Sequence, residues 1–326
     1  MFVPDPSMFK GRRVILAPMA GVSDRVFRRL CREQGAQLTY SEMVSAKGLS
    51  YANEKTVALM RPAPGEDVLS VQIFGHEPDT MAAQAAWIER QMPEALFSID
   101  INMGCPARKI AGKGDGSALM REPELAMRIV ESVSRSVDVP VTVKFRRGFH
   151  EGEETAPDFA ARMERAGAAA VAVHGRFAEQ FYRGSADWGT VARVKQAVSI
   201  PVVGNGDVCS GKDAAALVAA TSCDAVMVGR ASRGNPWVFA QVKAALEGES
   251  APQEPTLRER MDMACRHARL LAEEDGSPKI VRMRRHAMDY VAGFPGAAEL
   301  RRLISEAVTV DEFCQLFQRA AEGGAS

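Results

Sequence analysis

The sequence of 326 residues lacks an excess of charge of either sign, because 41 Lys and Arg residues balance 41 Asp and Glu residues. Net charge therefore predicts no nucleic-acid or membrane partner, although a local basic stripe would be enough to bind RNA. No apolar run is long enough to span a bilayer, and no basic segment followed by an apolar run opens the chain. We expect neither a membrane association nor a secretory signal.

The six cysteines are scattered and form neither a Cys-x-x-Cys pair nor a zinc-finger spacing. This scatter predicts a reduced, cytoplasmic protein without structural disulfides and without a metal site. A Gly-x-Gly-x-x-Gly fingerprint after an early strand is also missing, and this argues against a dinucleotide-binding open sheet.

Short β-rich runs alternate with longer amphipathic runs through residues 1–247. Eight runs are apolar and β-branched on both faces, as in a buried parallel sheet, and predict strands at 14–17, 37–42, 69–74, 97–101, 139–145, 170–174, 201–204 and 225–228. Helices are predicted at 24–34, 78–91, 122–136, 155–166, 188–197, 211–220 and 236–247, with 44–59 as a loop of one or two helical turns. This alternation favours an α/β fold, a (β/α)8 TIM barrel, over a doubly wound open sheet, since such barrels typically take about 250 residues.

The composition changes at residues 248–255, which predict a linker. Beyond it, residues 256–326 predict a smaller, all-helical domain with helices at 256–274, 279–292, 297–306 and 309–321. Thr309 and Glu312 have the spacing of a capping box at the start of the last helix.

Polar and ionisable residues follow nearly every predicted strand, and the carboxyl ends of barrel strands form the catalytic face. After the last two strands, Gly206 and Gly229 allow close backbone approach to an anion, and Arg230 can add charge-assisted hydrogen bonds. These loops predict a phosphate site. The alternative is that both glycines only form tight turns.

Lys144 ends an otherwise apolar strand, where burial would be costly unless an anion compensates its charge. It either pairs with a barrel carboxylate such as Asp100 or faces an anionic ligand such as a reduced flavin ring. His174 and Arg176 are either ligand-binding or core-lining residues. Amide edges suited to a planar heterocycle are offered by Gln72 and Asn102.

Cys105 lies in the run Asn102-Met103-Gly104-Cys105-Pro106, where the fourth predicted strand stops. A free thiol is mostly protonated near neutral pH and can act as a general acid. Buried cysteines are more often inert, but the position at a strand end favours catalysis. The other five cysteines are interpreted as structural.

Seven motifs, in order between residues 17 and 231, resemble the tRNA-dihydrouridine synthase family, and the resemblance covers the whole chain. They are Ala17-Pro18-Met19, Val71-Gln72-Ile73-Phe74-Gly75, Asn102-Met103-Gly104-Cys105-Pro106, Val143-Lys144-Phe145-Arg146, His174-Gly175-Arg176, Gly204-Asn205-Gly206-Asp207 and Val228-Gly229-Arg230-Ala231. The tail, with Arg284-Arg285-His286 and residues 293–297, resembles the bacterial B-type branch.

The resemblance implies FMN over the barrel mouth, reduced by NADPH, that passes hydride to C6 of a uridine while Cys105 protonates C5. The product would be 5,6-dihydrouridine in tRNA, with ribosomal RNA and the uridine position left open. The residues that would hold FMN are Pro18, Met19, Gln72, Lys144, His174, Asn205, Gly206, Asp207, Gly229 and Arg230. Those that would face the uracil or its phosphate are Asn102, Arg146 and Arg176.

Basic residues in two places are predicted to contact the RNA backbone. They are Arg108, Lys109 and Lys113 in the loop after Cys105, and Lys279, Arg282, Arg285 and His286 in the tail. Lys279, Arg282 and His286 have helical spacing and are expected to share one face, although a solvated helix with ordinary ion pairs is the alternative. Asp115 in the loop departs from the family, where a small apolar residue is common.

Two other functions remain open at this stage: an FMN barrel enzyme that reduces a small unsaturated ring, and a non-enzymatic RNA-binding protein on a similar barrel. The first leaves the helical tail without a role, and the second predicts loss of the thiol or of the phosphate-binding residues, all of which are present. We expect a monomer, since no apolar surface stripe remains after the two domains are drawn.

Overall fold

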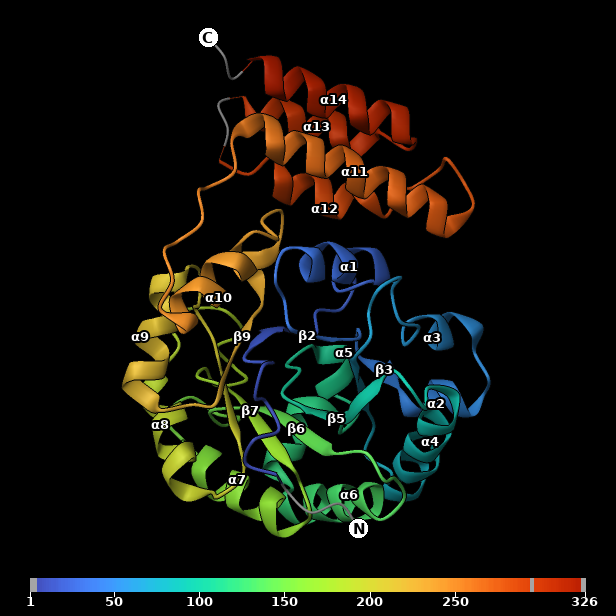
Figure 1. Cartoon of the computed structure of the whole chain (residues 1–326). Helices are drawn as coiled ribbons and strands as arrows, with labels where there is room; N and C mark the ends of the chain where they lie inside the picture. The colour runs from blue at the N-terminus through green and yellow to red at the C-terminus, as the bar shows by residue number, and fades with distance from the viewer. Residues whose placement is uncertain (1–4, 294–295, 324–326) are drawn as a thin grey trace.

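A closed parallel barrel forms the first part of the computed structural model, which describes residues 5–293 and 296–323 (Figure 1). Its strands are β1 (Val14–Leu16), β2 (Leu38–Tyr40), β4 (Leu69–Phe74), β5 (Leu96–Met103), β6 (Val141–Arg146), β7 (Ala170–His174), β8 (Val202–Asn205) and β9 (Ala225–Val228). The sheet closes because β1 pairs with both β2 and β9, and β2 pairs also with β4. The predicted (β/α)8 barrel is confirmed, and every predicted strand is present within a few residues.

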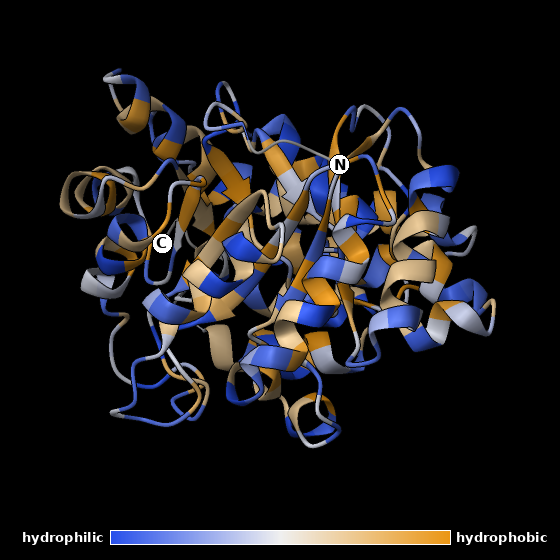
Figure 2. Cartoon of the chain, turned by 90° about the horizontal axis from the view of Figure 1, so that it is seen from below, coloured by the Kyte–Doolittle hydropathy of each residue, from blue (hydrophilic) through white to orange (hydrophobic). Residues whose placement is uncertain are grey.

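Helices surround the barrel on all sides, as Figures 1 and 2 show. The long crossover helices are α1 (Arg25–Glu33), α4 (Pro78–Gln91), α6 (Pro123–Ser134), α7 (Ala156–Arg165), α8 (Trp188–Ala197), α9 (Gly211–Thr221) and α10 (Val238–Glu247). The segment expected as a loop with helical turns contains β3 (Val44–Ser45), α2 (Ala46–Ser50) and α3 (Glu54–Ala58). Short helical turns α5 (Arg108–Ala111), η1 (Gly116–Arg121) and η2 (Arg230–Ser232) follow β5 and β9.

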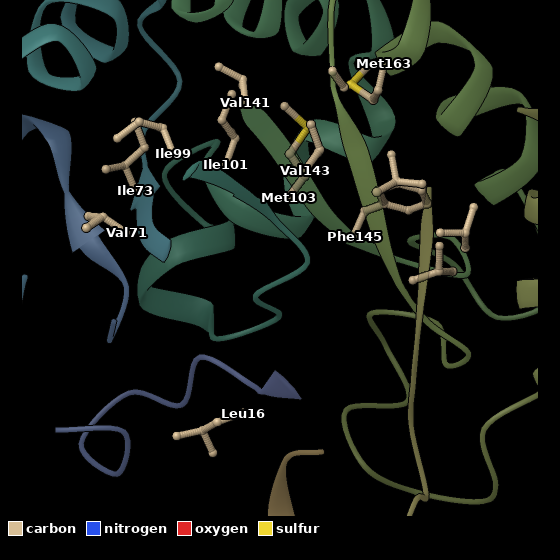
Figure 3. Close-up of a cluster of buried hydrophobic side chains, with 14 of the residues drawn as sticks. Leu16, Val71, Ile73, Ile99, Ile101, Met103, Val141, Val143, Phe145 and Met163 are labelled. Atoms are coloured by element: carbon tan, nitrogen blue, oxygen red, sulfur yellow. The ribbon is translucent and has the colours of Figure 1, made fainter. Parts of the chain in front are cut away.

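Alternation along the strands separates two apolar layers. Because successive side chains of a strand point to opposite faces, every second residue packs against the helices. Figure 3 shows part of this outer layer, in which Val143 and Phe145 of β6 lie near Met163 of α7. The other positions of β1, β2, β7, β8 and β9 form a separate apolar cluster that includes Ile15, Leu38, Tyr40, Ala172 and Met227.

Polar side chains occupy the inward positions of three neighbouring strands, β4, β5 and β6. The register places Ser70 beside Ser98, and Asp100 between Gln72 and Thr142. All five side chains are buried. The sequence reading of these strands as apolar on both faces was therefore wrong for β4–β6. The polar inward positions extend toward the carboxyl ends of the strands.

Four helices follow the barrel: α11 (Leu257–Asp275), α12 (Met283–Tyr290), α13 (Ala297–Glu306) and α14 (Val310–Gly323). Figure 1 shows them as a bundle above α1, and the bundle's apolar cluster includes Val26 and Leu30 of that helix. Capping boxes begin α11, with Thr256 and Glu259, and α14, where Glu312 and Thr309 bond each other as predicted.

Two cysteines of the bundle were expected to be reduced. The structure instead joins Cys265 of α11 and Cys314 of α14 by a disulfide, with Cα atoms 5.0 Å apart. Sequence spacing could not indicate this pair, since 49 residues separate them and only the packing of α11 on α14 brings them together.

Within the described residues, no helix combines the length and the apolar character needed to cross a membrane.

Candidate active site

The carboxyl ends of β5 to β8 bring the predicted site residues side by side. Strand register pairs Asn102 with Lys144, Arg146 with His174, and His174 with Asn205. All five side chains occupy inward positions, because they alternate with outer-layer residues along each strand. The prediction that these residues gather at one mouth of the barrel agrees with this register.

A chain of hydrogen bonds links the middle of the barrel to the loop that contains Cys105. Gln72 Nε2 donates to Asp100 Oδ2 at 2.7 Å, and Gln72 Oε1 accepts a hydrogen bond from Asn102 Nδ2 at 2.8 Å. Asn102 Oδ1 then accepts the backbone N–H groups of Gly104 and Cys105, at 3.2 and 2.9 Å. Because a carboxylate can only accept, Asp100 fixes the direction of every donor in this chain.

The pKa of Asp100 is raised to about 6, chiefly by burial, while hydrogen bonds from Gln72 and Thr142 and the charge of Lys144 oppose the rise. Thr142 Oγ1 donates to Asp100 Oδ1 at 2.6 Å. At neutral pH the carboxylate form therefore predominates, as the direction of the amide chain requires.

Cys105 is half-buried in the loop after β5. Its carbonyl oxygen accepts the backbone N–H of Ser117 at 3.1 Å, so the loop folds back on the thiol-bearing residue. Gly116 permits this contact, since it adopts a φ of +61° and a Cβ there would lie 2.8 Å from the Cys105 carbonyl oxygen. Cys105 interacts electrostatically with Lys144 and Arg146. The thiol thus faces a cationic surrounding.

Lys144 has no hydrogen-bond or ion-pair partner among the described residues. Burial and the charge of Arg146 lower its pKa to about 8, although Asp100 and Cys105 favour its charged form. The alternative of a direct Lys144–Asp100 ion pair is not realised, because the carboxylate of Asp100 is bonded to Gln72 and Thr142. A lysine at the mouth without an ion-pair partner among the described residues fits a ligand-facing role.

His174 is 6% exposed, and its Nδ1 atom is buried without a hydrogen-bond partner. Burial holds its pKa well below the ordinary range, and the positive charges of Arg146, Lys144, Arg176 and Arg230 act in the same direction. The imidazole is therefore neutral, with one ring nitrogen free to bond a ligand.

Two arginines fasten the loop after β7. Arg146 Nε donates to the carbonyl oxygen of Gly104 at 2.8 Å, and its Nη1 donates to those of Phe177 and Phe181. Burial lowers the pKa of Arg146 to about 10, so it stays charged at neutral pH. Arg176 donates to the carbonyl oxygens of Arg183 and Gly184. The two guanidinium groups thus set the course of residues 177–184.

This loop presents an aromatic residue, Tyr182, to which the sequence analysis assigned no role. Tyr182 is 55% exposed, and the guanidinium carbons of Arg230 and Arg146 lie 4.6 and 5.7 Å from its ring centre. An exposed ring between two cations is suited to stack on a nucleobase or to lie over an anionic ligand.

The loops after β8 and β9 meet through an acidic residue. Asp207, at a φ of 56°, receives two hydrogen bonds of 2.7 Å from Arg176 and one of 3.0 Å from Arg230. Burial has the largest single effect and raises the pKa of Asp207, but the hydrogen bonds from Arg176 and Ala186 and the charges of both arginines together hold it below its ordinary range. Asp207 therefore positions both arginines. Its carboxylate, being negatively charged, is unsuited to contact an anionic ligand itself.

The remaining predicted cofactor residues line the same mouth. Asn205 Nδ2 donates to the carbonyl oxygen of Met227 at 2.8 Å, and the carbonyl oxygen of Gly206 accepts from Trp188. A Cβ at Gly229 would lie 3.6 Å from Ala17 and 3.9 Å from the sulfur of Met19, which places the loop after β9 beside the half-buried Pro18 and Met19. Strands that are far apart in sequence thus converge here.

The basic residues predicted to grip RNA divide into two groups. The first group is exposed on and beside α5, next to the loop after β5 that carries Cys105, called here the thiol loop, and consists of Arg108, Lys109 and Lys113. Within the described residues, these three side chains form no ion pair. Arg285 of α12 is also exposed and approaches the mouth, since a Cβ at Gly21 would lie 2.5 Å from its Nη1 atom.

The expected common face of Lys279, Arg282 and His286 is not formed. Helix α12 begins only at Met283, because Lys279 forms an isolated β-bridge with Thr309. His286 is 2% exposed and faces Asp24, whereas Lys279 and Arg282 are exposed. Helical spacing failed as a guide here because the helix does not extend over all three residues.

Sequence reasoning singled out Asp115 without finding its partner. Asp115 Oδ1 lies 2.7 Å from His76 Nδ1, just beyond β4, so this acid links the thiol loop to the neighbouring loop. The position of His76 could have indicated this contact, since it lies two residues beyond the predicted strand 69–74, at the same face as the Cys105 loop.

Fold and site together define a TIM-barrel enzyme with a thiol and several cations at the carboxyl ends of its strands. The family model for dihydrouridine synthase (Dus) matches residues 15–324. The tRNA-dihydrouridine synthase B of Xanthomonas axonopodis pv. citri (strain 306) is 42% identical over 301 residues, 92% of this chain and 90% of that protein. The chain belongs to the dihydrouridine synthase family, whose members are flavin-dependent oxidoreductases.

A second relative supports the same family membership, and one solved structure supports the fold. A tRNA-dihydrouridine synthase B of Pseudomonas aeruginosa is 41% identical over 93% of this chain and 90% of that protein, which confirms the resemblance to the B-type branch. Among solved structures, histamine dehydrogenase from Rhizobium sp. 4-9 has a TM-score of 0.51 and 13% identity, covering 72% of this chain and 46% of that chain. This likeness concerns the barrel fold alone.

Proposed function

We propose that this protein uses FMN and NADPH to reduce specific uridines in tRNA to 5,6-dihydrouridine, with Cys105 as the proton donor. The observation that supports this most directly is a half-buried thiol that interacts electrostatically with Lys144, a lysine without an ion-pair partner among the described residues. The adjacent strand of the same barrel mouth carries His174, whose Nδ1 has no hydrogen-bond partner. We propose the cytoplasm as the location, since tRNA and NADPH are both available there.

The residues present fit FMN. The ammonium of Lys144 suits the negative charge that a reduced flavin ring bears, and the unpartnered Nδ1 of His174 offers one hydrogen bond. Arg230 and the backbone of Gly206 and Gly229 suit the phosphate. The ring would also be held by Pro18, Met19, Gln72 and Asn205. When bound, FMN reduced by NADPH supplies the hydride that reaches C6 of the uracil.

Asp207 is assigned a different role from the one that the resemblance implied. Its carboxylate would repel a phosphate, and its oxygens are bonded to Arg176 and Arg230. We assign it to hold these two guanidinium groups in place, so that Arg230 faces the phosphate.

Cys105 completes the reduction of the C5=C6 bond. Its S–H gives a proton to C5 on the face opposite the hydride donor, and the thiolate regains a proton from water. The nearby charges of Lys144 and Arg146 stabilise the thiolate that forms. Asn102 holds the backbone of Cys105, and one hydrogen of its Nδ2 remains for a ligand.

Arg146 is better placed than Arg176 to face the uracil or its phosphate. Among the described residues, no acceptor binds Nη2 of Arg146, whereas both Nη atoms of Arg176 are bonded to Asp207 or Gly184. We therefore assign Arg146 to substrate contact and Arg176 to the position of the loop.

The RNA would lie over the barrel mouth between the thiol loop and the bundle. A uridine in folded RNA must be turned out of the stack to reach this mouth. Arg108, Lys109 and Lys113 on one side, and Arg285 on the other, would bind the phosphate backbone. We propose residues 1–247 as the catalytic domain, 248–255 as the linker and 256–326 as the RNA-binding domain.

The test is mass spectrometry of bulk RNA from a strain that lacks this gene, complemented with the wild-type chain, Cys105→Ala or Cys209→Ala. Cys209 is a matched control, because it is an exposed free cysteine at the same end of the barrel, after β8. We expect dihydrouridine to fall in the deletion strain and to be restored by the wild type and by Cys209→Ala only. The modified positions would also distinguish tRNA from ribosomal RNA.

Unchanged dihydrouridine in a strain without a redundant relative would contradict the RNA assignment and favour reduction of a small free ring. Restoration by Cys105→Ala would leave the RNA assignment intact but remove Cys105 as the acid.

A further inference from the structure

Three side chains that the proposed reaction does not use meet where the barrel contacts the helical bundle. Asp24 precedes α1 as its N-cap, His267 lies on α11 and His286 on α12. One ligand atom from each lies within 4.8 Å of the other two. Asp24 lies far from both histidines in sequence, so only the docking of the bundle on α1 assembles the three.

His267 has an unsatisfied nitrogen in this cluster. The residue is 0% exposed, and Nε2 is buried with no hydrogen-bond partner. Its other ring nitrogen, Nδ1, lies 3.4 Å from the hydroxyl of Tyr290. A buried polar atom left without a hydrogen-bond partner destabilises the folded state, so a missing partner for Nε2 is expected.

The other two members are already oriented. His286 Nε2 lies 3.1 Å from Asp24 Oδ2, and Asp24 Oδ1 accepts the backbone N–H of Phe27 at 2.9 Å. The Phe27 ring stacks on His286, with ring centres 5.4 Å apart, and His286 lies 4.3 Å from the ring of His267. The aromatic packing restricts both imidazoles.

We propose that Asp24, His267 and His286 bind a borderline divalent cation of the zinc type, which joins the barrel to the helical bundle. Two imidazoles and one carboxylate are ligands that Zn²⁺ and Co²⁺ accept, with about 2.0–2.2 Å between metal and ligand atom. A fourth position is left for water. The three ligand atoms lie within 4.8 Å of one another, so binding would require side-chain rotations that bring all three to these distances from one ion.

The surroundings are those of an ordered metal site. Ligating histidines usually bond a second group through the other ring nitrogen, and the hydroxyl of Tyr290 is so placed for His267. The backbone N–H of Phe27 does the same for the carboxylate of Asp24. Both contacts fix the ligands before a metal arrives.

A positive charge competes with the metal. Arg282 Nη1 lies 3.8 Å from Asp24 Oδ2, while its Nη2 is bonded to Asp275 at 2.8 Å. Because Arg282 already pairs with Asp275 and is exposed, it can move away at little cost. A metal-free cluster, in which His286 is held only by its contact with Asp24, is the alternative, and it leaves Nε2 of His267 unsatisfied.

The test is titration of the chelator-treated, flavin-loaded enzyme with Co²⁺ and Zn²⁺. We expect one Co²⁺ per chain with visible d–d bands to the red of the flavin absorption, displaced by Zn²⁺, and a higher thermal unfolding midpoint with Zn²⁺. His267→Gln should abolish this binding. The matched control is His150→Gln, because His150 is a half-exposed histidine on the barrel whose carboxylate partner is Glu179.

A milder variant guards against misfolding. Tyr290→Phe keeps the buried ring and removes only the hydroxyl, so we expect folded protein whose Co²⁺ affinity is about 10-fold lower. X-ray absorption of the Co²⁺-loaded wild type needs no variant and should show imidazole ligands.

Two results would overturn the proposal. One is a wild-type enzyme that takes up no stoichiometric Co²⁺ or Zn²⁺. The other is binding that His267→Gln retains or that His150→Gln removes. Neither result bears on the reduction of uridine, which is measured separately.

Discussion

The side-chain oxygen of Asn102 accepts the backbone N–H of Cys105 at 2.9 Å, while the amide nitrogen of the same residue donates to Gln72 at 2.8 Å. The position of the thiol therefore depends on which way the Asn102 amide is turned. Gln72 in turn donates to Asp100, which can only accept. A buried carboxylate in the middle of the barrel thus sets the geometry of a loop at its mouth.

This dependence predicts that Asn102→Asp is destabilising and that a second substitution corrects it. The substituted side chain has no N–H for Gln72, so the Gln72 amide would face a carboxylate at both ends and could satisfy only one. We expect a loss of about 1–3 kcal/mol in the free energy of urea unfolding. Adding Asp100→Asn reverses the chain, with the new amide donating to Gln72 and Gln72 donating to the new carboxylate.

The double variant should therefore lose less unfolding free energy than the sum of the two single losses, by about 0.5–3 kcal/mol. Ser70→Ala is the control, since the Ser70 side chain bonds Ser98 and Tyr40 in the same interior and not the residues of the amide chain. Its effect should add independently to that of Asn102→Asp. Simple additivity of Asn102→Asp and Asp100→Asn would show that the direction of the amides is not coupled.

Lys144 predicts a pH dependence for FMN binding. Its pKa is lowered to about 8, mainly by burial, so the ammonium loses its proton as the pH rises through about 8. The affinity of the flavin-free protein for FMN should fall over this range. Lys144→Met should bind FMN weakly with no such step, whereas Lys195→Met, which alters a lysine paired with Asp224, should keep the wild-type profile. Flavin fluorescence measures each dissociation constant.

The lowered pKa of Lys144 has the opposite effect on folding stability, which it makes rise with pH. Between pH of about 8 and the ordinary value of 10.5, the unfolded chain binds the Lys144 proton and the flavin-free folded protein does not. The contribution of Lys144 to stability therefore rises with pH in this window and is least below it. A fall with pH, relative to Lys144→Met, would contradict the assigned pKa.

The sequence was sufficient for the barrel and for the strand ends that carry the predicted site residues. Strand ends are local features, and parallel strands place them at one face, so Cys105, Lys144 and His174 could be grouped without a structure. The contacts of long side chains could not be predicted. Arg176 turns toward Asp207, and His286 turns inward to Asp24, because of loops and packing that no local pattern encodes.

Substitution of His174 is predicted to affect FMN affinity and unfolding stability differently. In the flavin-free protein its Nδ1 is buried and unpartnered, so His174→Leu removes an unsatisfied group while it keeps most of the packing. We expect unfolding stability that is unchanged or higher, together with FMN affinity about 10-fold lower, since one hydrogen bond of about 1.4 kcal/mol is lost. His150→Leu, at an exposed site, should change neither. A destabilised variant with normal FMN affinity would mark His174 as a packing residue.

The His76–Asp115 contact predicts how firmly the loop beside the thiol is held. His76 Nδ1 and Asp115 Oδ1 are 2.7 Å apart, and Asp115 is 8% exposed. Ser117, two residues after Asp115, donates its backbone N–H to the carbonyl oxygen of Cys105, so the contact lies close to the thiol-bearing residue. Asp115→Ala should free this loop and raise amide hydrogen exchange in residues 113–117 by up to about 5-fold, the equivalent of about 1 kcal/mol for a partly exposed pair. His76→Ala should have the same effect, and the double variant should add nothing further, because either substitution alone already breaks the contact.

Glu179→Ala, which breaks the comparable pair with His150, is the control and should leave exchange in this loop unchanged. Additive effects of the two substitutions would show that Asp115 holds the loop by some contact other than His76, and the departure from the family at this position would then need another explanation.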